Sequence, residues 1–233
     1  MPSAPHPRIA ERAVQPRYTF AEAARILGRK GETLRRWALG HDRLYRGQPR
    51  HDPPLIRIDG SDAGEDTPPL SFLNLIELRF LASWRRSITL PAIREALDFA
   101  ASQLEAKRPL LDLDFKLHGH DLFVRYETEL LTATRSGQVV WPDAVDTLLA
   151  SLDYDEKEQA AYRWWPLGRQ RPVLLDTRVN GGKPTTADTG VRTISIATRL
   201  REGWELEEVR EDTAATLIEI KAAAEIEGIR LSA

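Results

Sequence analysis

The chain has 233 residues, 42% hydrophobic and 29% charged, as expected for a globular protein with one large domain or two smaller ones. It has no cysteine, which excludes disulfides and thiolate metal sites and is compatible with a reducing compartment. It shows neither the run of about 18 apolar residues of a membrane span nor the apolar core of a signal peptide. We therefore expect a cytoplasmic protein without a membrane partner.

The net charge of −2 conceals an uneven distribution. Residues 1–109 hold 18 Lys and Arg against 13 Asp and Glu, a net charge of +5. Residues 110–233 hold 15 against 22, a net charge of −7. A basic first half favours phosphate contacts, and an acidic second half argues against DNA running across the whole molecule.

Two short helices are predicted near the start of the chain. Thr19 and Glu22 have the spacing of a capping box, and Gly28 is placed to end that helix. A second helix begins a few residues later and would carry Leu34 and Trp37 inward. Two helices joined by a tight glycine-containing turn predict a helix-turn-helix whose second helix enters a DNA groove. An ordinary helical hairpin with a solvated basic face is the alternative.

The outward face of the second helix is the candidate DNA-reading surface. We expect Glu32, Thr33 and Arg36 to face bases. Phosphate contacts are expected from the basic residues around them: Arg29, Lys30, Arg35, Arg43 and Arg57.

We also expect a wing after this helix. Residues 40–50 are predicted to be a loop, 55–58 a short alternating strand, 60–69 a polar turn and 70–72 the return strand. Four arginines would then flank the groove: Arg43, Arg46, Arg50 and Arg57. For any single one of them, a place in a solvated basic loop is the alternative.

A strongly apolar helical region follows. Ser71 is placed to cap a helix over 72–84 that is hydrophobic on nearly every side, and such a helix must be covered by more than one neighbour. A further stripe is formed by Ile93, Leu97, Ala100 and Leu104. This surplus of apolar surface indicates a subunit contact as well as a core, and a two-fold homodimer would match a palindromic operator.

The middle of the chain reads as a small antiparallel β-layer over about 110–175. Strands are expected at 121–126, 130–134, 137–141, 161–167 and 172–175, with a helix at 145–152. Trp164 and Trp165 are either core residues or an exposed anchor for a partner.

The C-terminal segment is predicted to be a hairpin followed by three helices. The turn-rich hairpin extends over 181–193, and Thr193 is placed to cap the first helix. The second helix covers 206–212, and a Thr216–Glu219 capping box opens the third. The predicted fold class is therefore α+β, mainly α, with an N-terminal winged helix-turn-helix, a central β-layer and a C-terminal three-helix, helix-turn-helix-like domain.

Each partial match to a catalytic, cofactor-binding or metal-binding motif lacks a required residue. Gly182-Lys183 lacks the hydroxyl residue and the earlier glycine of a phosphate loop. The acidic run 153–158 lacks the glycine and final glutamate of a calcium loop. His118 and His120 have no third ligand at zinc spacing. We expect no catalytic residue, no metal and no cofactor.

Several stretches together resemble known families. The 18–37 stretch, with its Thr33-Leu34-Arg35 core, and the helices that follow resemble MerR-type winged helix-turn-helix domains. Over about 18–230 the chain resembles VapB-type antitoxins, whose C-terminal domain carries three short motifs. Here they read Arg178-Val179, Gly181-Gly-Lys-Pro184 and Thr189-Gly-Val191.

The resemblance implies an antitoxin that binds operator DNA as an autorepressor and neutralises a PIN-like ribonuclease toxin. It implies a MerR-like DNA-binding domain (17–109) and an antitoxin domain (176–233), joined by the predicted β-rich connection (110–175). The Pro-rich start of the chain predicts a disordered tail (1–16). Candidate partner-binding residues are Trp164, Trp165, Leu217 and Ile218.

Two departures from the family pattern stand out. Lys30-Gly31 occupies the place of a hydroxyl cap, which gives the second helix a weaker start, and the 214–218 segment is unusually apolar. That segment is either covered by a partner or packed inward.

Two other functions remain open. A MerR-like regulator would sense a small molecule through its second half. An enzyme such as a nuclease would need a carboxylate cluster, which the sequence does not offer.

Overall fold

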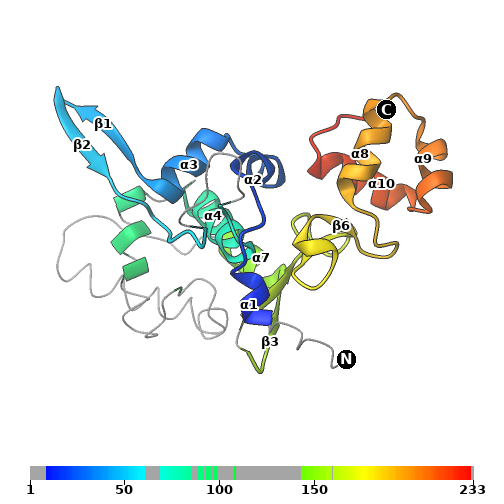
Figure 1. Cartoon of the computed structure of the whole chain (residues 1–233), viewed down its shortest axis with the longest axis horizontal. Helices are drawn as coiled ribbons and strands as arrows, with labels where there is room; N and C mark the ends of the chain where they lie inside the picture. Colours follow the sequence, from blue (N-terminus) through cyan, green and yellow to red (C-terminus); the bar gives the residue numbers. More distant parts are fainter. Residues whose placement is uncertain are drawn as a thin grey trace, which may run out of the picture.

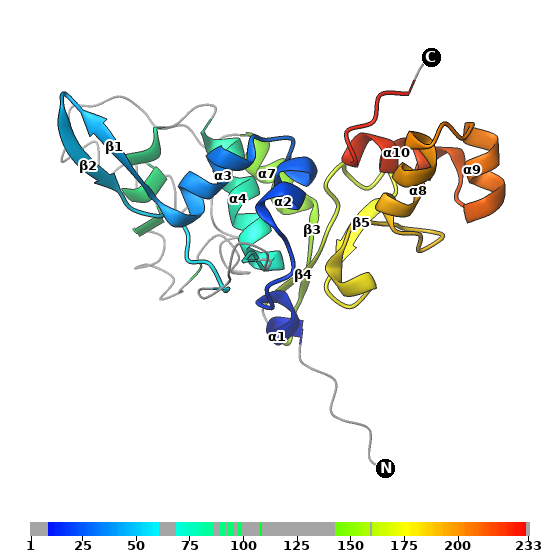
Figure 2. The ribbon, with the colours of Figure 1, turned by 45° about the horizontal axis from the view of Figure 1, so that its top comes forward.

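The computed structural model describes residues 9–60, 69–85, 89–91, 93–95, 97–98, 108, 143–158 and 160–231. Within them, a helix-turn-helix unit with a β-hairpin lies at one end of the molecule and three helices lie at the other (Figure 1). A small antiparallel sheet lies between these ends (Figure 2). The predicted mixed architecture, with a helix-turn-helix near the N-terminus, is confirmed at this level.

The helix-turn-helix consists of α2 (Phe20–Leu27) and α3 (Gly31–Leu39). The Thr19 hydroxyl accepts the Glu22 N–H at 3.1 Å, and the Glu22 carboxylate accepts the Thr19 N–H at 2.9 Å. Gly28 ends α2 with a φ of 58°, a left-handed conformation that favours glycine. Lys30 is the N-cap of α3 and makes no side-chain capping bond, as the sequence predicts.

The wing is a hairpin of β1 (His41–Tyr45) and β2 (Gln48–Asp52) directly after α3. The strands pair antiparallel from His41↔Asp52 to Tyr45↔Gln48. The two-residue turn has φ values of 51° at Arg46 and 79° at Gly47, the positive pair that a tight hairpin with native twist requires.

Our prediction of the wing strands was therefore wrong. Residues 55–58 are not a strand: the Leu55 N–H donates to the Trp37 carbonyl oxygen at 2.8 Å, and Ile56 is buried. Leu70 makes only an isolated bridge with Tyr18. The alternation at 55–58 reflects packing onto the core, whereas both strands of the real hairpin are almost entirely solvent-exposed and show no apolar alternation.

Helix α4 (Phe72–Trp84) is the centre of the core. It begins with a Ser71–Asn74 capping box, and 12 of its 13 residues are buried within this chain, against α3 and α7 (Asp143–Ala150) among others. Its apolar surface is thus covered by the chain itself, which removes α4 as an argument for a homodimer. Ile93 is also fully buried, whereas Ala100, Leu104 and the strands predicted over 121–141 lie outside the described residues.

The sheet has the strand order β3 (Leu152–Asp155), β4 (Ala160–Trp164), β5 (Val173–Asp176) and β6 (Thr185–Thr186), all antiparallel. Its inner residues Leu152, Ala161, Trp164 and Leu175 belong to the same hydrophobic core as α2, α3 and α4. The described part of the sheet is therefore fused to the helix-turn-helix unit through one core.

The start of the described chain is a short helix, α1 (Ile9–Ala13), and not a disordered tail. It packs on β4, with Ala13 fully buried and the Ala10 N–H donating to a Glu158 carboxylate oxygen at 2.8 Å. The sequence gives little sign of this because α1 is too short for a helical stripe. Residues 1–8 lie outside the described residues.

The C-terminal unit contains α8 (Thr193–Arg201), α9 (Leu206–Thr213) and α10 (Leu217–Ile226), preceded by a 3₁₀ turn at Asn180–Gly182. The Thr216–Glu219 capping box is present as predicted. Thr193 does not cap α8; Arg192 is at the cap, and the Thr193 hydroxyl instead donates to a Glu227 carboxylate oxygen at 2.6 Å. Because the Thr193 hydroxyl bonds to the buried Glu227 carboxylate, it does not cap the start of α8. No helix within the described ranges is long and apolar enough to cross a membrane.

Candidate nucleic-acid interface

Helix α3 separates its residues into an inner and an outer face. Leu34, Trp37 and Ala38 are buried. Glu32, Arg35 and Arg36 are exposed and Thr33 is half-buried, so the predicted base-facing residues lie on or beside the free face of the helix.

The two arginines of α3 are held in different ways. Arg36 Nε lies 2.9 Å from the Glu32 carboxylate one turn earlier, and both side chains are more than half exposed. Arg35 lies over the Phe20 ring, 4.9 Å from its centroid. An exposed ion pair such as Arg36–Glu32 contributes little to stability, so Arg36 can exchange its carboxylate partner for another acceptor at low cost.

The remaining predicted phosphate contacts are spread around the helix-turn-helix. Arg29 donates to the Ala82 carbonyl oxygen at 3.1 Å and so ties the turn before α3 to the end of α4. Lys30 and Arg57 are exposed. Arg29 thus has a structural task that its sequence position did not reveal.

The hairpin directs one charged face toward α3. In the antiparallel register, His41, Arg43, Arg50 and Asp52 lie on the same face. Arg43 hydrogen-bonds to Asp52, whose carboxylate also lies 3.4 Å from Arg50 and 3.7 Å from His41. The hydrogen bond from Arg43 keeps the pKa of Asp52 below its ordinary value. One carboxylate therefore lies within 4 Å of both arginines and the histidine of this face.

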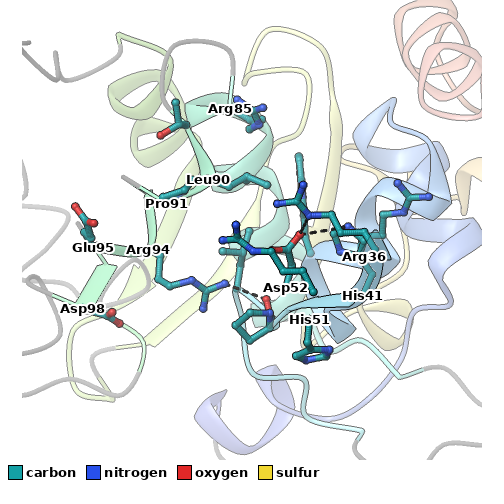
Figure 3. Close-up of a pocket in the computed structure, with 16 residues that line it drawn as sticks. Arg36, His41, His51, Asp52, Arg85, Leu90, Pro91, Arg94, Glu95 and Asp98 are labelled. Atoms are coloured by element: carbon teal, nitrogen blue, oxygen red, sulfur yellow. Dashed lines mark hydrogen bonds and ion pairs between the residues drawn. The ribbon is translucent and has the colours of Figure 1, made fainter. Parts of the chain in front are cut away.

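A hollow of about 590 Å³ lies between the hairpin, α3 and the 89–98 segment (Figure 3). Arg94 reaches across it and donates to the Pro53 and Pro54 carbonyl oxygens at 2.9 and 3.0 Å. Five arginines line the hollow against three carboxylates: Arg36, Arg43, Arg50, Arg85 and Arg94 against Asp52, Glu95 and Asp98. Guanidinium groups bind phosphate in a fork geometry, so this basic hollow beside an exposed helix suits a nucleic-acid backbone.

The sequence did not reveal that these groups come together. The predicted wing left Arg43 and Arg50 in a loop, and no motif in the sequence marks Arg85 or Arg94. The positional signal was the Arg46-Gly47 pair between two short polar runs, but neither run shows the apolar alternation of a strand.

The three C-terminal helices lack a comparable surface. Helix α10 would be the reading helix of a second helix-turn-helix, but six of its ten residues are buried, and α9 carries Glu207, Glu208, Glu211 and Asp212. A helix with a buried face and an acidic neighbour cannot approach phosphates closely. The candidate DNA-reading surface therefore lies in the N-terminal unit.

The four predicted partner-binding residues have different environments. Trp164 is 1% exposed, so it is a core residue, the first of the two alternatives, and is not an exposed partner anchor. Trp165 is half-buried and donates from Nε1 to Asp153 at 3.2 Å. Leu217 packs on the three-helix core, whereas Ile218 is 61% exposed. Of the four, only Ile218 presents an exposed apolar side chain. Val179, at 40% exposure, and Trp204, at 39%, are also exposed in the described residues, and the sequence did not single them out as partner contacts.

Among the residues that the structure describes, no three His, Cys, Asp or Glu side chains are grouped to hold a metal ion. Asp153 and Asp155 lie in β3, where Asp153 accepts a hydrogen bond from Arg169 and Asp155 accepts one from the Glu158 N–H. His118 and His120 lie outside the described part of the chain.

Residues 16–97 match a family model described as "Putative DNA-binding HTH domain". Over 222 residues the chain is 26% identical to the "Putative antitoxin VapB45" of Mycobacterium tuberculosis, covering 89% of this chain and 92% of that protein. It is also 26% identical over 218 residues to "Uncharacterized protein Rv2308" of the same organism, covering 88% of this chain and 87% of that protein.

A solved structure shares this architecture. The X-ray crystal structure of Rv2018 from M. tuberculosis superposes with a TM-score of 0.69 at 25% sequence identity, over 90% of this chain and 97% of that one. Together these likenesses show a helix-turn-helix protein that is distantly related, over almost its whole length, to a protein described as a putative antitoxin.

Proposed function

We propose that the protein is the antitoxin of a type II toxin–antitoxin system, which binds operator DNA as an autorepressor and neutralises a PIN-like ribonuclease toxin. Two findings together support this proposal. A helix-turn-helix match over 16–97 is joined to likeness with the "Putative antitoxin VapB45" over 89% of the chain. The hollow of five arginines beside α3 supports the DNA-binding part independently of the relatives.

For DNA, we propose that α3 enters the major groove as in MerR-like winged helix-turn-helix proteins. Glu32, Thr33 and Arg36 would face bases, because they lie on or beside its free face. The backbone would be held by Lys30, Arg35, Arg43, Arg50 and Arg57, with Arg29 contributing the part of its guanidinium that Ala82 does not use.

For the toxin, we propose that the acidic second half provides the docking surface. Ile218, Val179 and Trp204 are its most exposed large apolar side chains in the described residues, with Leu217 and Trp165 beside the core. We retain the division into 17–109, 110–175 and 176–233 as functional segments, and a homodimer as the state that would match a palindromic operator.

A ligand-responsive MerR-like regulator is the second candidate. The hollow of about 590 Å³ favours it, since pockets for small molecules fall in the range of about 300 to 1,000 Å³. A ligand that binds in this hollow would raise the melting temperature of the chain in the absence of DNA. An antitoxin would show no such gain with any member of a metabolite panel.

The DNA-binding proposal is tested by binding to duplex DNA from upstream of the protein's own gene. Arg36→Ala is expected to weaken binding by about 1–3 kcal/mol and to relax base preference at one position. The matched control is Arg171→Ala, since Arg171 is also half exposed and paired with a glutamate, Glu225, but lies in the sheet-to-C-terminal region. Unchanged sequence preference in Arg36→Ala would remove Arg36 as a base contact.

A further inference from the structure

The 181–184 turn packs against the start of the helix-turn-helix, far from it in sequence. Gly182 has a φ of +78°, and a Cβ atom there would lie 3.0 Å from the Tyr18 hydroxyl oxygen. That hydroxyl, on a fully buried tyrosine, donates to the Gly182 carbonyl oxygen. The close approach requires glycine at this position, so the turn is shaped for contact with Tyr18.

Lys183 adds a charged contact to the same place. Its Nζ donates to the Arg17 carbonyl oxygen at 2.6 Å and to the Glu22 carboxylate at 2.5 Å. Glu22 uses its other oxygen to complete the capping box of α2. Burial acts to raise the pKa of Glu22, but the hydrogen bonds from Lys183 and Thr19 outweigh it and lower the pKa. One carboxylate therefore starts helix α2 and also holds the turn that leads through β6 to the C-terminal unit.

A second ion pair lies one turn further along α2. Arg25 Nε is 2.9 Å from Glu227, a carboxylate that is almost fully buried and also accepts the Thr193 hydroxyl. Along α2, the acidic Glu22 is followed by the basic Arg25. Their partners have the opposite charges, Lys183 for Glu22 and Glu227 for Arg25. Two contacts of opposite polarity favour one orientation, because reversing the order of the contacts along α2 would place Lys183 beside Arg25 and Glu227 beside Glu22.

Helix α2 also packs on α3, the candidate reading helix. We propose that Lys183 is a positioning residue that, through Glu22, fixes the C-terminal unit on α2, and that this contact couples the binding of a partner protein by the C-terminal unit to DNA binding by α3. The coupling part rests on the proposed DNA-binding function, whereas the positioning part does not. A partner protein on the C-terminal unit would then alter DNA affinity, and DNA would alter partner affinity by the same factor.

The positioning part is tested in the full chain without DNA. Because the chain has no cysteine, Gln48→Cys on the hairpin and Glu211→Cys on α9 give a unique pair of spin labels. We expect one narrow distance distribution, which broadens in Lys183→Met and equally in Glu22→Gln, whose amide can still cap α2. Lys221→Met, at an exposed lysine of the same unit, is the control and should match the parent. Unchanged distributions in both variants would overturn the proposal.

Denaturant unfolding separates this contact from general damage to the fold. If Lys183 and Glu22 act on each other, the double variant should unfold with an equilibrium constant about tenfold smaller than the two single effects predict together. Additive effects would mean that the pair does not interact.

The coupling part is tested by hydrogen exchange with duplex DNA from upstream of the gene. DNA should slow exchange in α2 and in the 181–184 turn, and Lys183→Met should confine that effect to the N-terminal unit. Protection that stops at α3 in the parent protein would overturn the coupling. If the parent binds no DNA, the proposed function and the coupling both fail, while the spin-label result still decides the positioning.

Discussion

Glu77 provides the most quantitative prediction, because it is a buried carboxyl in the core helix. Its side chain is 8% exposed, accepts from Asn74 at 3.1 Å and lies 3.2 Å from Arg108. Burial is the dominant influence and raises the pKa of Glu77 from 4.5 to about 7, against the opposing effect of Arg108. In the folded protein this carboxyl therefore holds its proton to higher pH than in the unfolded chain.

The sign of the stability effect follows from proton linkage. Between pH 4.5 and about 7 the folded state binds more protons, so Glu77 lowers the free energy of unfolding as pH rises through that window. A shift of this size corresponds to roughly 3 kcal/mol. Glu77→Gln removes the titration and keeps an acceptor for Asn74, so its stability relative to the parent should rise by about 3 kcal/mol between pH 4.5 and 8.

Urea unfolding of both proteins across this pH range measures the difference directly. Glu77→Met provides the control, since it differs from Glu77→Gln in absolute stability but must show the same change with pH. A difference between parent and variants that is independent of pH would refute the reasoning, because it would mean that Glu77 does not titrate in this window.

Three further predictions concern stability. Gly182→Ala should lower the free energy of unfolding by about 1–3 kcal/mol through strain at φ +78° and contact with Tyr18. In the same chemical unfolding assay Gly190→Ala, at φ +70° with nothing within 4 Å, should cost less. Thr216→Ala should cost about 1 kcal/mol by removing the capping box of α10, which calorimetry would register as a lower melting temperature. Leu78→Ala, at a fully buried position of α4, should cost about 2–5 kcal/mol in urea unfolding, and a loss below 1 kcal/mol would mean that α4 is not the centre of the core.

Elements with strong local signals could be predicted from the sequence. The capping boxes at Thr19 and Thr216, the glycine end of α2 and the buried α4 all depend on residues close together in the chain. Here local propensity and tertiary packing agree, and the predictions were confirmed.

The wing could not be placed in this way, because its strands are stabilised by backbone pairing around a tight turn and not by a buried face. Residues 55–58 have the alternating pattern instead, yet they pack on the core without a strand partner. The same limit applies to Thr193, whose hydroxyl is drawn to Glu227 from 34 residues away. Long-range acceptors of this kind leave no mark in the local sequence.

The candidate site was predictable in its reading helix but not in its surroundings. Glu32, Arg35 and Arg36 lie on the free face of α3 as the helical period indicates. The basic hollow needs the hairpin and the 89–98 segment to fold against α3, and the role of Lys183 needs a contact that spans 161 residues. Spatial convergence over such distances is a property of the fold and not of the local spacing.

The proposed function requires that one chain binds both the operator DNA and the toxin. It is tested most directly by size-exclusion chromatography with light scattering on this protein co-expressed with the product of the neighbouring gene, in the presence of duplex DNA from upstream of the operon. We expect a single species that contains both proteins and the duplex. Elution of the neighbouring product by itself, with this chain on the DNA or free, would contradict it.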